Sequence, residues 1–310
     1  MSADPANSSA PGSISNILEF DRISFTYPCS FEPSIHSLTL NLPLGFRCGL
    51  IGENGCGKTT LFLLANGLLR PQRGQIRWRS QPIGYGRKEL AELRQRIGLV
   101  FQNPEHQLVA TTVAEDLAYG LVNLGLEESE IRHRIETVAE WFDLGDLLNQ
   151  PVHRLSLGQK KQLSLADVMV LEPELLLLDE PTAYLSPGHC RDLRRQLQGI
   201  HAAGTTIVVA THDLEFLQSW ANWLLVMDRG QLVMQGPPTE LFRQQLRLEE
   251  LNLGIPPTLE LLAHWRQLAE DQLPLRQAEL DALEKQLLSR TELLPTSSSI
   301  TASTNGRTNP

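Results

Sequence analysis

The chain has 310 residues, of which 41% are hydrophobic and 20% charged, a balance typical of a globular protein with one sizeable core and room for a small second unit. Its formal net charge of -9 argues against nucleic acid as a partner, because proteins that bind the phosphate backbone normally carry a net positive charge. No apolar run reaches the roughly 18 to 20 residues that span a bilayer, and no basic segment precedes an apolar one at the start, so we expect a chain that is neither exported nor membrane-spanning.

Residues 1–16 are rich in Ser, Ala, Pro, Gly and Asn and poor in apolar side chains, a composition typical of disordered segments. Between residues 17 and 51 the pattern changes to short alternating or apolar segments such as 38–42, and residues 75–79 repeat it. These segments predict the strands of a small antiparallel sheet. We therefore expect the main folded domain to begin at residue 17, and we place its end at residue 247.

A glycine-rich loop joins an apolar segment, 48–51, to a helix-forming run, 60–69. Residues 52–59 read Gly-Glu-Asn-Gly-Cys-Gly-Lys-Thr, which matches the pattern G-x-x-x-x-G-K-[ST] of phosphate-binding loops. The glycines let backbone N–H groups turn toward one point, and the following helix directs its positive dipole end there. Lys58 supplies a mobile cation for the outer phosphates, and Thr59 is expected to ligate Mg2+. The residues of this segment predicted to bind nucleotide are Gly52, Asn54, Gly55, Gly57, Lys58, Thr59 and Thr60.

Three apolar runs with little alternation are typical of parallel strands that helices cover on both faces. The runs are 97–101, 175–178 and 206–210. Between the first two, apolar residues recur three or four apart, which predicts helices over 113–124, 131–142 and 156–170. The sequence therefore predicts an α/β fold with a mostly parallel sheet flanked by helices, an N-terminal antiparallel β subdomain, and an α-helical subdomain inserted at about 103–171.

The run over residues 175–178 leads into two adjacent carboxylates, Asp179 and Glu180. Adjacent residues on a strand point in opposite directions. As the strand ends, Asp179 can face a Mg2+ ion while Glu180 reaches an attacking water, so the pair divides metal binding from general-base catalysis. An exposed acidic turn is the alternative interpretation.

The helix predicted over 156–170 begins within the sequence Leu-Ser-Leu-Gly-Gln. Ser156 is a suitable N-cap, and the start of the helix offers free N–H groups to an anion. A capped surface helix explains Ser156 equally well when the segment is considered alone. The order is informative, however, because this helix leads directly into the strand that ends at Asp179.

After residue 236 a further helix is predicted to about residue 248. Gly-Ile-Pro-Pro at 254–257 then breaks the chain before a last amphipathic stretch. We expect residues 248–295 to form a helical C-terminal extension that packs on the parent domain or holds two chains together, and residues 296–310 to be a disordered tail. The apolar stripes of this extension are Leu259, Leu262, Trp265 and Leu268, followed by Leu280, Leu283 and Leu287.

Five motifs in this order resemble those of the ATP-binding subunits of ABC transporters: a phosphate loop, a glutamine loop, an L-S-x-G-Q signature, an acidic strand end and a histidine after the last strand. The resemblance covers roughly residues 18–246. Residues 101–107, Phe-Gln-Asn-Pro-Glu-His-Gln, and 112–120, Thr-Val-Ala-Glu-Asp-Leu-Ala-Tyr-Gly, are more similar to the ATPases of energy-coupling-factor and cobalt or nickel importers. The resemblance implies a P-loop NTPase core, ATP and Mg2+ as cofactors, and ATP hydrolysis coupled to uptake of a metal ion or a vitamin.

Carried over residue by residue, the resemblance assigns Tyr27 to stacking on adenine, with a core or turn tyrosine as the alternative. It assigns Gln102 to contact with Mg2+ and the attacking water, and His212 to a hydrogen bond with the γ-phosphate. Glu180, His212 and Gln102 are thus the expected catalytic residues, and Thr59, Gln102 and Asp179 the expected metal ligands.

In this family two ATPase chains pair head to tail. The resemblance therefore implies that Ser156, Gly158 and Gln159 of one chain close on the γ-phosphate held by Lys58 of the other. The second chain is either identical or a paralogue. The helical insertion would contact a transmembrane coupling subunit, which works with a membrane substrate-binding subunit, so we expect a peripheral location on the cytoplasmic face of the cell membrane.

Two positions depart from the family pattern. Ser186 stands where the family usually has Asp, which predicts weaker communication across the dimer, and Leu157 stands where glycine is commonest. Neither change removes a group needed for chemistry, so we expect an active ATPase.

Other readings remain open. The chain could serve another branch of ABC transporters, because no part of an ATPase subunit contacts the cargo. A non-transport ABC ATPase is disfavoured, since the sequence shows neither the long coiled coils nor the paired ATPase units of such proteins. A regulatory module that binds ATP without turnover would be expected to lack Glu180 or His212, and both are present.

Overall fold

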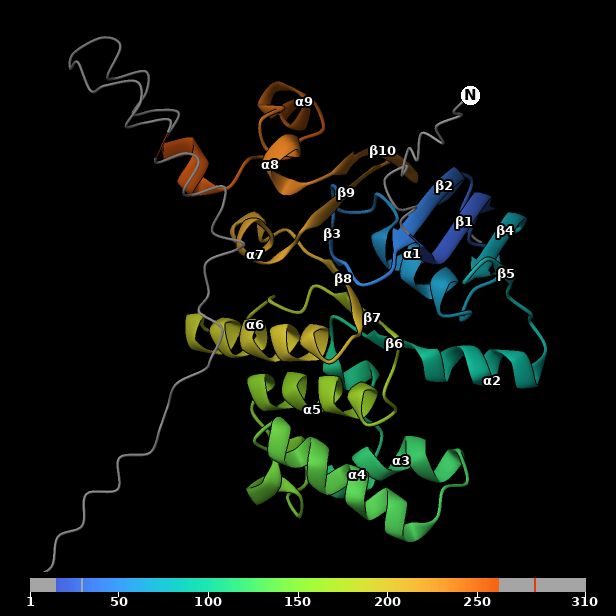
Figure 1. Cartoon of the computed structure of the whole chain (residues 1–310), viewed down its shortest axis with the longest axis vertical. Helices are drawn as coiled ribbons and strands as arrows, with labels where there is room; N and C mark the ends of the chain where they lie inside the picture. The colour runs from blue at the N-terminus through green and yellow to red at the C-terminus, as the bar shows by residue number, and fades with distance from the viewer. Residues whose placement is uncertain (1–14, 29, 262–281, 283–310) are drawn as a thin grey trace, which may run out of the picture. The chain divides into compact units, whose positions relative to one another are not determined.

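The computed structural model describes residues 15–28, 30–261 and 282. The chain divides into two compact units, residues 1–256 and 257–310, and the helices and strands below belong to the first (Figure 1). This unit runs to Pro256, past the predicted domain end at residue 247, and Leu248, Leu253 and Ile255 are buried. The domain end at residue 247 stays a prediction. The predicted C-terminal tail, the first fourteen residues of the predicted disordered segment and most of the stripe residues lie outside the described residues. Those stripe residues are Leu262, Trp265, Leu268, Leu280, Leu283 and Leu287.

An antiparallel sheet forms the N-terminal part of the unit, as predicted, with the strand order β2-β1-β4-β5. Its strands are β1 (Asn16–Phe25), β2 (Ile35–Pro43), β4 (Arg73–Trp78) and β5 (Gln81–Pro82). Phe20 of β1 lies opposite Leu40 of β2 and Ile76 of β4, and all three are buried on one face of the sheet. Asn16 was predicted to be disordered; it is instead the first residue of β1, because it pairs with Pro43.

The central sheet has the order β10-β9-β3-β8-β7-β6, and all of its pairs are parallel except β9 with β10. Its strands are β3 (Arg47–Ile51), β6 (Ile97–Val100), β7 (Leu175–Asp179), β8 (Thr206–Ala210), β9 (Trp223–Asp228) and β10 (Gln231–Gly236). Every residue of β6, β7 and β8 is buried, as the unbroken apolar runs predicted. The mostly parallel α/β fold is thus confirmed.

Helices flank the central strands: in Figure 1, α6 and α7 lie on one side and α1 on the other. They are α1 (Lys58–Ala65), α2 (Arg87–Arg96), α6 (Pro187–Ala202) and α7 (Leu214–Trp220). The sequence pattern did not predict α2, because Leu93 is its one buried residue and the helix therefore has no apolar stripe.

The helical insertion is also present, and Figure 1 shows it at the end of the unit away from the antiparallel sheet. It contains α3 (Val113–Asn123), α4 (Glu128–Trp141) and α5 (Leu157–Met169), with short 3-10 turns at η1 (Pro104–His106), η2 (Gly145–Leu147) and η3 (Val152–Arg154). α3 and α5 both begin with a capping box, in which a Thr or Ser and a Glu or Gln three residues later bond each other's backbone N–H.

The single helix expected between residues 236 and 248 is instead two short ones, α8 (Pro238–Leu241) and α9 (Gln245–Glu250). A turn separates them, in which the Gln244 N–H donates to the Leu241 carbonyl at 2.9 Å. Leu241, Phe242 and Leu248 are all buried around this turn. No helix of the described residues is long and apolar enough to cross a membrane.

The arrangement of the central sheet places the site. β3, β8, β7 and β6 lie side by side and run in the same direction, so their carboxyl ends share one edge. Residues 52–57 follow β3 at this edge, and Glu180 follows β7. His212 lies just after β8 and Gln102 just after β6. In open α/β sheets, ligands bind outside the carboxyl ends of the strands. Four segments far apart in the sequence therefore meet at one place.

Candidate functional site

The loop between β3 and α1 depends on glycine at two positions. Gly57 has φ +108°, a left-handed conformation that other residues rarely adopt, and a Cβ there would lie 2.6 Å from the Ser34 carbonyl oxygen. A Cβ on Gly52 would lie 2.3 Å from the Met227 carbonyl oxygen. Among the described residues no side chain caps the start of α1, so its first N–H groups have no side-chain partner there. This is the geometry of an anion-binding loop.

Lys58 is the first residue of α1 and only 7% exposed. Its ammonium donates to the Gly52 carbonyl at 2.7 Å and to the Glu53 carbonyl at 3.3 Å, which closes the loop on itself. The Cys56 thiol lies 4.0 Å from the same ammonium, and burial raises the pKa of this thiol. Cys56 is therefore a thiol rather than a thiolate at neutral pH, which fits a small packing residue.

Two of the predicted metal ligands touch each other. Thr59 Oγ1 donates a hydrogen bond to Asp179 Oδ2 at 2.6 Å. Burial raises the pKa of Asp179, while the bond from Thr59 and the charge of Lys58 act in the opposite direction. Burial disfavours the charged form of this carboxylate, so a bound cation would stabilise it. An adjacent hydroxyl and carboxylate are oxygen ligands of the kind that Mg2+ prefers. These residues fit a Mg2+ ion.

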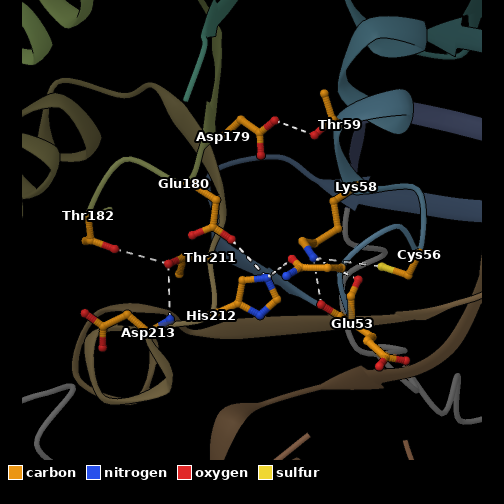
Figure 2. A network of polar contacts seen from close by, with 12 residues as sticks. Glu53, Cys56, Lys58, Thr59, Asp179, Glu180, Thr182, Thr211, His212 and Asp213 are labelled. Atoms are coloured by element: carbon orange, nitrogen blue, oxygen red, sulfur yellow. Dashed lines mark hydrogen bonds and ion pairs between the residues drawn. The ribbon is translucent and has the colours of Figure 1, made fainter. Parts of the chain in front are cut away.

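Glu180, His212 and Asn54 form a second cluster, of which Figure 2 labels Glu180 and His212. His212 Nε2 lies 2.8 Å from Asn54 Oδ1 and 3.3 Å from Glu180 Oε1. Because an amide oxygen only accepts hydrogen bonds, His212 Nε2 carries the hydrogen and donates it to Asn54. Glu180 Oε1 is buried and has no hydrogen-bond donor among the described residues. The carboxylate as a whole is 14% exposed and lines the open cleft described below, so it can accept a proton from a water bound there.

Tyr27 stands at the edge of the loop, with 37% of its surface exposed. Its hydroxyl lies 3.3 Å from Thr60 Oγ1, and its ring packs edge-on against Phe25 with 5.0 Å between ring centres. The ring is thus held in place from both ends while part of it stays open to a ligand.

An open cleft of about 500 Å³ collects these groups. The predicted residues that line it are Tyr27, Asn54, Gly55, Gly57, Lys58, Thr59, Thr60, Gln102, Asp179, Glu180 and His212. Ser34 and Ala183 also line the cleft and were missed by the sequence patterns. Ala183 follows Glu180 by three residues and could have been found from that position; Ser34, in the turn before β2, carries no sequence signal.

The structure does not bring the signature residues into this cleft. Ser156 and Gln159 bond each other at the start of α5, through Gln159 N–H to Ser156 Oγ at 3.3 Å and Ser156 N–H to Gln159 Oε1 at 2.9 Å. Gly158 packs beside His189. Gly52, the first residue of the loop, is buried and is not a lining residue either. The signature is thus a separate, solvent-facing turn of the same chain.

The sheet and its phosphate loop define a P-loop ATPase cassette. The ABC transporter family model matches residues 35–183. A putative ABC transporter ATP-binding protein of Nostoc sp. is 52% identical over 246 residues, which are 79% of this chain and 90% of that protein. The energy-coupling factor transporter ATP-binding protein EcfA of Methanocaldococcus jannaschii is 36% identical over 246 residues, which are 79% of this chain and 88% of that protein.

The structure of cbiO1 from Clostridium perfringens, described as part of the ABC transporter complex cbiONQ, aligns with a TM-score of 0.68 and 36% identity. The alignment covers 77% of this chain and 95% of cbiO1. The chain therefore belongs to the ATP-binding proteins of ABC transporters, and it is an ATPase subunit related to those of energy-coupling factor transporters.

Proposed function

We propose that this chain is the ATPase of an energy-coupling-factor or cobalt-type importer, that it works as a head-to-tail dimer, and that it drives uptake of a metal ion or a vitamin. The relatives named above support the transporter class, since one is an energy-coupling factor ATP-binding protein and another is part of a cbiONQ complex. An ATPase of another ABC transporter branch is the alternative.

The location of the signature turn carries the proposal of a dimer. Ser156 and Leu157 are exposed, and neither belongs to the cleft that holds Lys58. The open cleft contains the groups that hold a nucleotide from one side only. A second copy, placed head to tail, would bring its own α5 N-terminus over the outer phosphate and complete two equivalent sites.

Within each site the residues have distinct roles. Thr59, Asp179 and Gln102 would hold Mg2+, which neutralises charge on the outer phosphates when it is bound. Glu180 accepts the proton of the attacking water as the general base. His212, already a donor through Nε2, would bond the γ-phosphate, and Tyr27, which is 37% exposed, would stack on the base.

An apolar surface on the helical insertion supports a membrane partner. Val109, which follows the glutamine loop, is 66% exposed, and Tyr119 and Val122 of α3 are 58% and 60% exposed. Large exposed apolar side chains that cluster in one subdomain favour a protein contact. We propose that this surface docks a transmembrane coupling subunit, which places the chain at the cytoplasmic face of the cell membrane.

The experiment that tests this function is purification of the tagged chain from its native membranes in mild detergent, followed by mass spectrometry of the proteins that remain bound. We expect a transmembrane coupling subunit together with a small substrate-binding membrane protein, and the latter identifies the cargo. A conventional permease pair would move the chain to another transporter branch. Recovery of no membrane protein would overturn the transport function.

A further inference from the structure

Lys161, on the second turn of α5, binds the chain segment that follows β7. Its ammonium donates to three backbone carbonyls: Glu180 at 3.3 Å, Pro181 at 3.1 Å and Ala183 at 2.7 Å. A lysine ammonium has three hydrogens to donate, so these contacts use all of them. No carboxylate of the described residues lies within ion-pair distance of Lys161. The cation is therefore used to hold backbone.

The backbone that Lys161 holds is that of the proposed general base. Glu180 has φ +46°, a left-handed conformation that costs free energy for any residue other than glycine and persists only where its surroundings impose it. The Glu180 N–H donates to the Ala210 carbonyl at 2.8 Å, and the Glu180 carbonyl accepts from Lys161. Both backbone polar groups are thus restrained, which fixes the position from which the Glu180 side chain extends.

A second contact joins the same two segments. The ring of His189 lies against Gly158, so closely that a Cβ on Gly158 would be 3.1 to 3.3 Å from three of its ring atoms. Ser186 Oγ lies 2.9 Å from His189 Nδ1 and caps the start of α6. The first turns of α5 are therefore attached to the segment 180–189 at both of its ends, through Lys161 and through Gly158.

Because a helix moves as a rigid element, displacement of the signature turn would be transmitted to Glu180. We propose that Lys161 is a positioning residue, which couples the signature turn of α5 to the catalytic Glu180 of the same chain. This rests on the proposed head-to-tail dimer. In that dimer Ser156 of one chain contacts the nucleotide held by the second chain. The contact fixes the position of the first chain's Glu180 carboxylate, which acts on the nucleotide held by the first chain. Lys161 acts through the Glu180 backbone and touches neither nucleotide.

Three single variants of the full-length chain test the proposal. Lys161→Met removes the donors and keeps the apolar stem, Lys161→Arg keeps a cationic donor, and Lys160→Met is the matched control on the same helix. The Lys160 ammonium pairs with Glu105 at 2.9 Å and not with the segment after β7. We measure kcat and KM for MgATP, and dimer formation with a non-hydrolysable ATP analogue by size-exclusion chromatography.

We expect Lys161→Met to lower kcat by about 10- to 100-fold, the usual effect of a small misplacement of a catalytic group, with KM and analogue-driven dimer formation unchanged. Lys161→Arg should recover most of the loss, and Lys160→Met should stay within about 2-fold of the parent chain. In the Glu180→Gln background, Lys161→Met should add no further loss, because the group that it positions is already absent.

A folded Lys161→Met chain with the parent kcat, or one whose loss adds to that of Glu180→Gln, overturns the inference. Lys161→Leu, which also lacks a donor, replaces the Met variant if that chain does not fold, and the same fall in kcat is expected. The proposed dimer fails separately: in that case the parent chain itself forms no dimer with the analogue.

Discussion

Two helices of this molecule, α1 and α5, both begin at a small N-cap residue, Gly57 and Ser156, and their starts have different surroundings. At α1 no side chain caps the helix, and Lys58 is buried in a cleft with Asp179 and Glu180 close by. At α5 Ser156 and Gln159 already satisfy each other, and the turn faces solvent. Under the proposed function, α1 would hold the nucleotide because binding groups gather around its start, while the capped and exposed start of α5 would contribute only against a second chain.

The largest effect on ATP turnover is expected in the cleft at the start of α1, where nucleotide binding and hydrolysis can be measured separately. Glu180→Gln should lower ATP turnover by about 10²- to 10⁴-fold, the usual contribution of a general base, with ATP binding and dimer formation retained. Phosphate release and equilibrium nucleotide binding measure the two properties. Glu128→Gln, at an exposed position of α4, is the control. Equal loss of binding and turnover would refute the role of Glu180.

The difference between the starts of α1 and α5 also predicts that a variant of one restores activity to a variant of the other when the two chains are mixed. Lys58→Ala removes the cation of the cleft, and Leu157→Glu puts a negative charge at the exposed signature turn without harming the helix start, where acidic residues are favourable. Each variant alone should be inactive. In an equal mixture half of the dimers contain one chain of each kind and one intact site, so at most about a quarter of the parent activity should return. The return falls below a quarter where Glu180 depends on the signature turn of its own chain, because the intact site uses Glu180 of the Leu157→Glu chain.

Leu157→Gln, which adds no charge, serves as the control for the signature variant. If the activity of the mixture equals the mean of the two separate variants, the sites are not shared between chains. The starts of α1 and α5 would then act within one chain.

A smaller effect, on the free energy of unfolding, is expected at the contact between α5 and α3. Asp167 of α5 faces Asp116 of α3, and Asp116 Oδ1 accepts from the N–H groups of Val109 at 2.9 Å and Ala110 at 2.6 Å. Asp116 Oδ2 and Asp167 Oδ1 are buried and have no hydrogen-bond partner among the described residues. Burial, with the adjacent Asp116 carboxylate, raises the pKa of Asp167 well above its usual range, so a proton on Asp167 supplies the missing donor.

Since the folded pKa of Asp167 is raised, its contribution to stability is fully present below the pKa of a free aspartate and is lost as pH rises through the folded value. We therefore expect Asp167→Asn to increase the free energy of unfolding by about 1 to 2 kcal/mol at pH 8 and by less at pH 5. Urea unfolding at the two pH values measures this. Asp146→Asn, at an exposed position, is the control, and a gain independent of pH would contradict the shared proton.

The smallest effects are expected at the rim of the cleft. Tyr27→Ala should weaken ATP binding by about 10-fold, the range of one base stacked on one aromatic ring. Tyr27→Phe keeps the ring and loses only the contact with Thr60, so its affinity should stay within about 2-fold of the parent. Calorimetric titration with ATP separates the two variants, and similar losses in both would assign Tyr27 to packing instead of stacking.

Much of the fold was predictable because each feature has a local signal. Uninterrupted apolar runs predicted β6, β7 and β8, and parallel strands that end at one edge bring the residues that follow them together. α2 was not predicted because it buries a single side chain, and the β9–β10 hairpin and the break between α8 and α9 were likewise missed. In those segments long-range packing outweighs any local pattern.

The candidate site divides in the same way. The phosphate loop, Asp179 and His212 are recognisable in the sequence because each chemical role requires particular residue types at the end of a strand. The roles of Lys161 and of the Asp116–Asp167 pair are not, because they depend on which side chains meet across α5. A lysine in a surface-like helical pattern is usually solvated, and only its three carbonyl partners distinguish this one.

The α/β class, the nucleotide-binding loop and the residues that follow the parallel strands can be read from the sequence, because glycine geometry, phosphate charge and unbroken apolar runs act over a few residues. The folded chain was needed to show that the signature turn lies apart from the cleft, that Lys161 holds the strained backbone of Glu180, and that His189 lies against Gly158. Those contacts join residues about twenty to thirty positions apart, and the path of the folded chain alone determines whether they form.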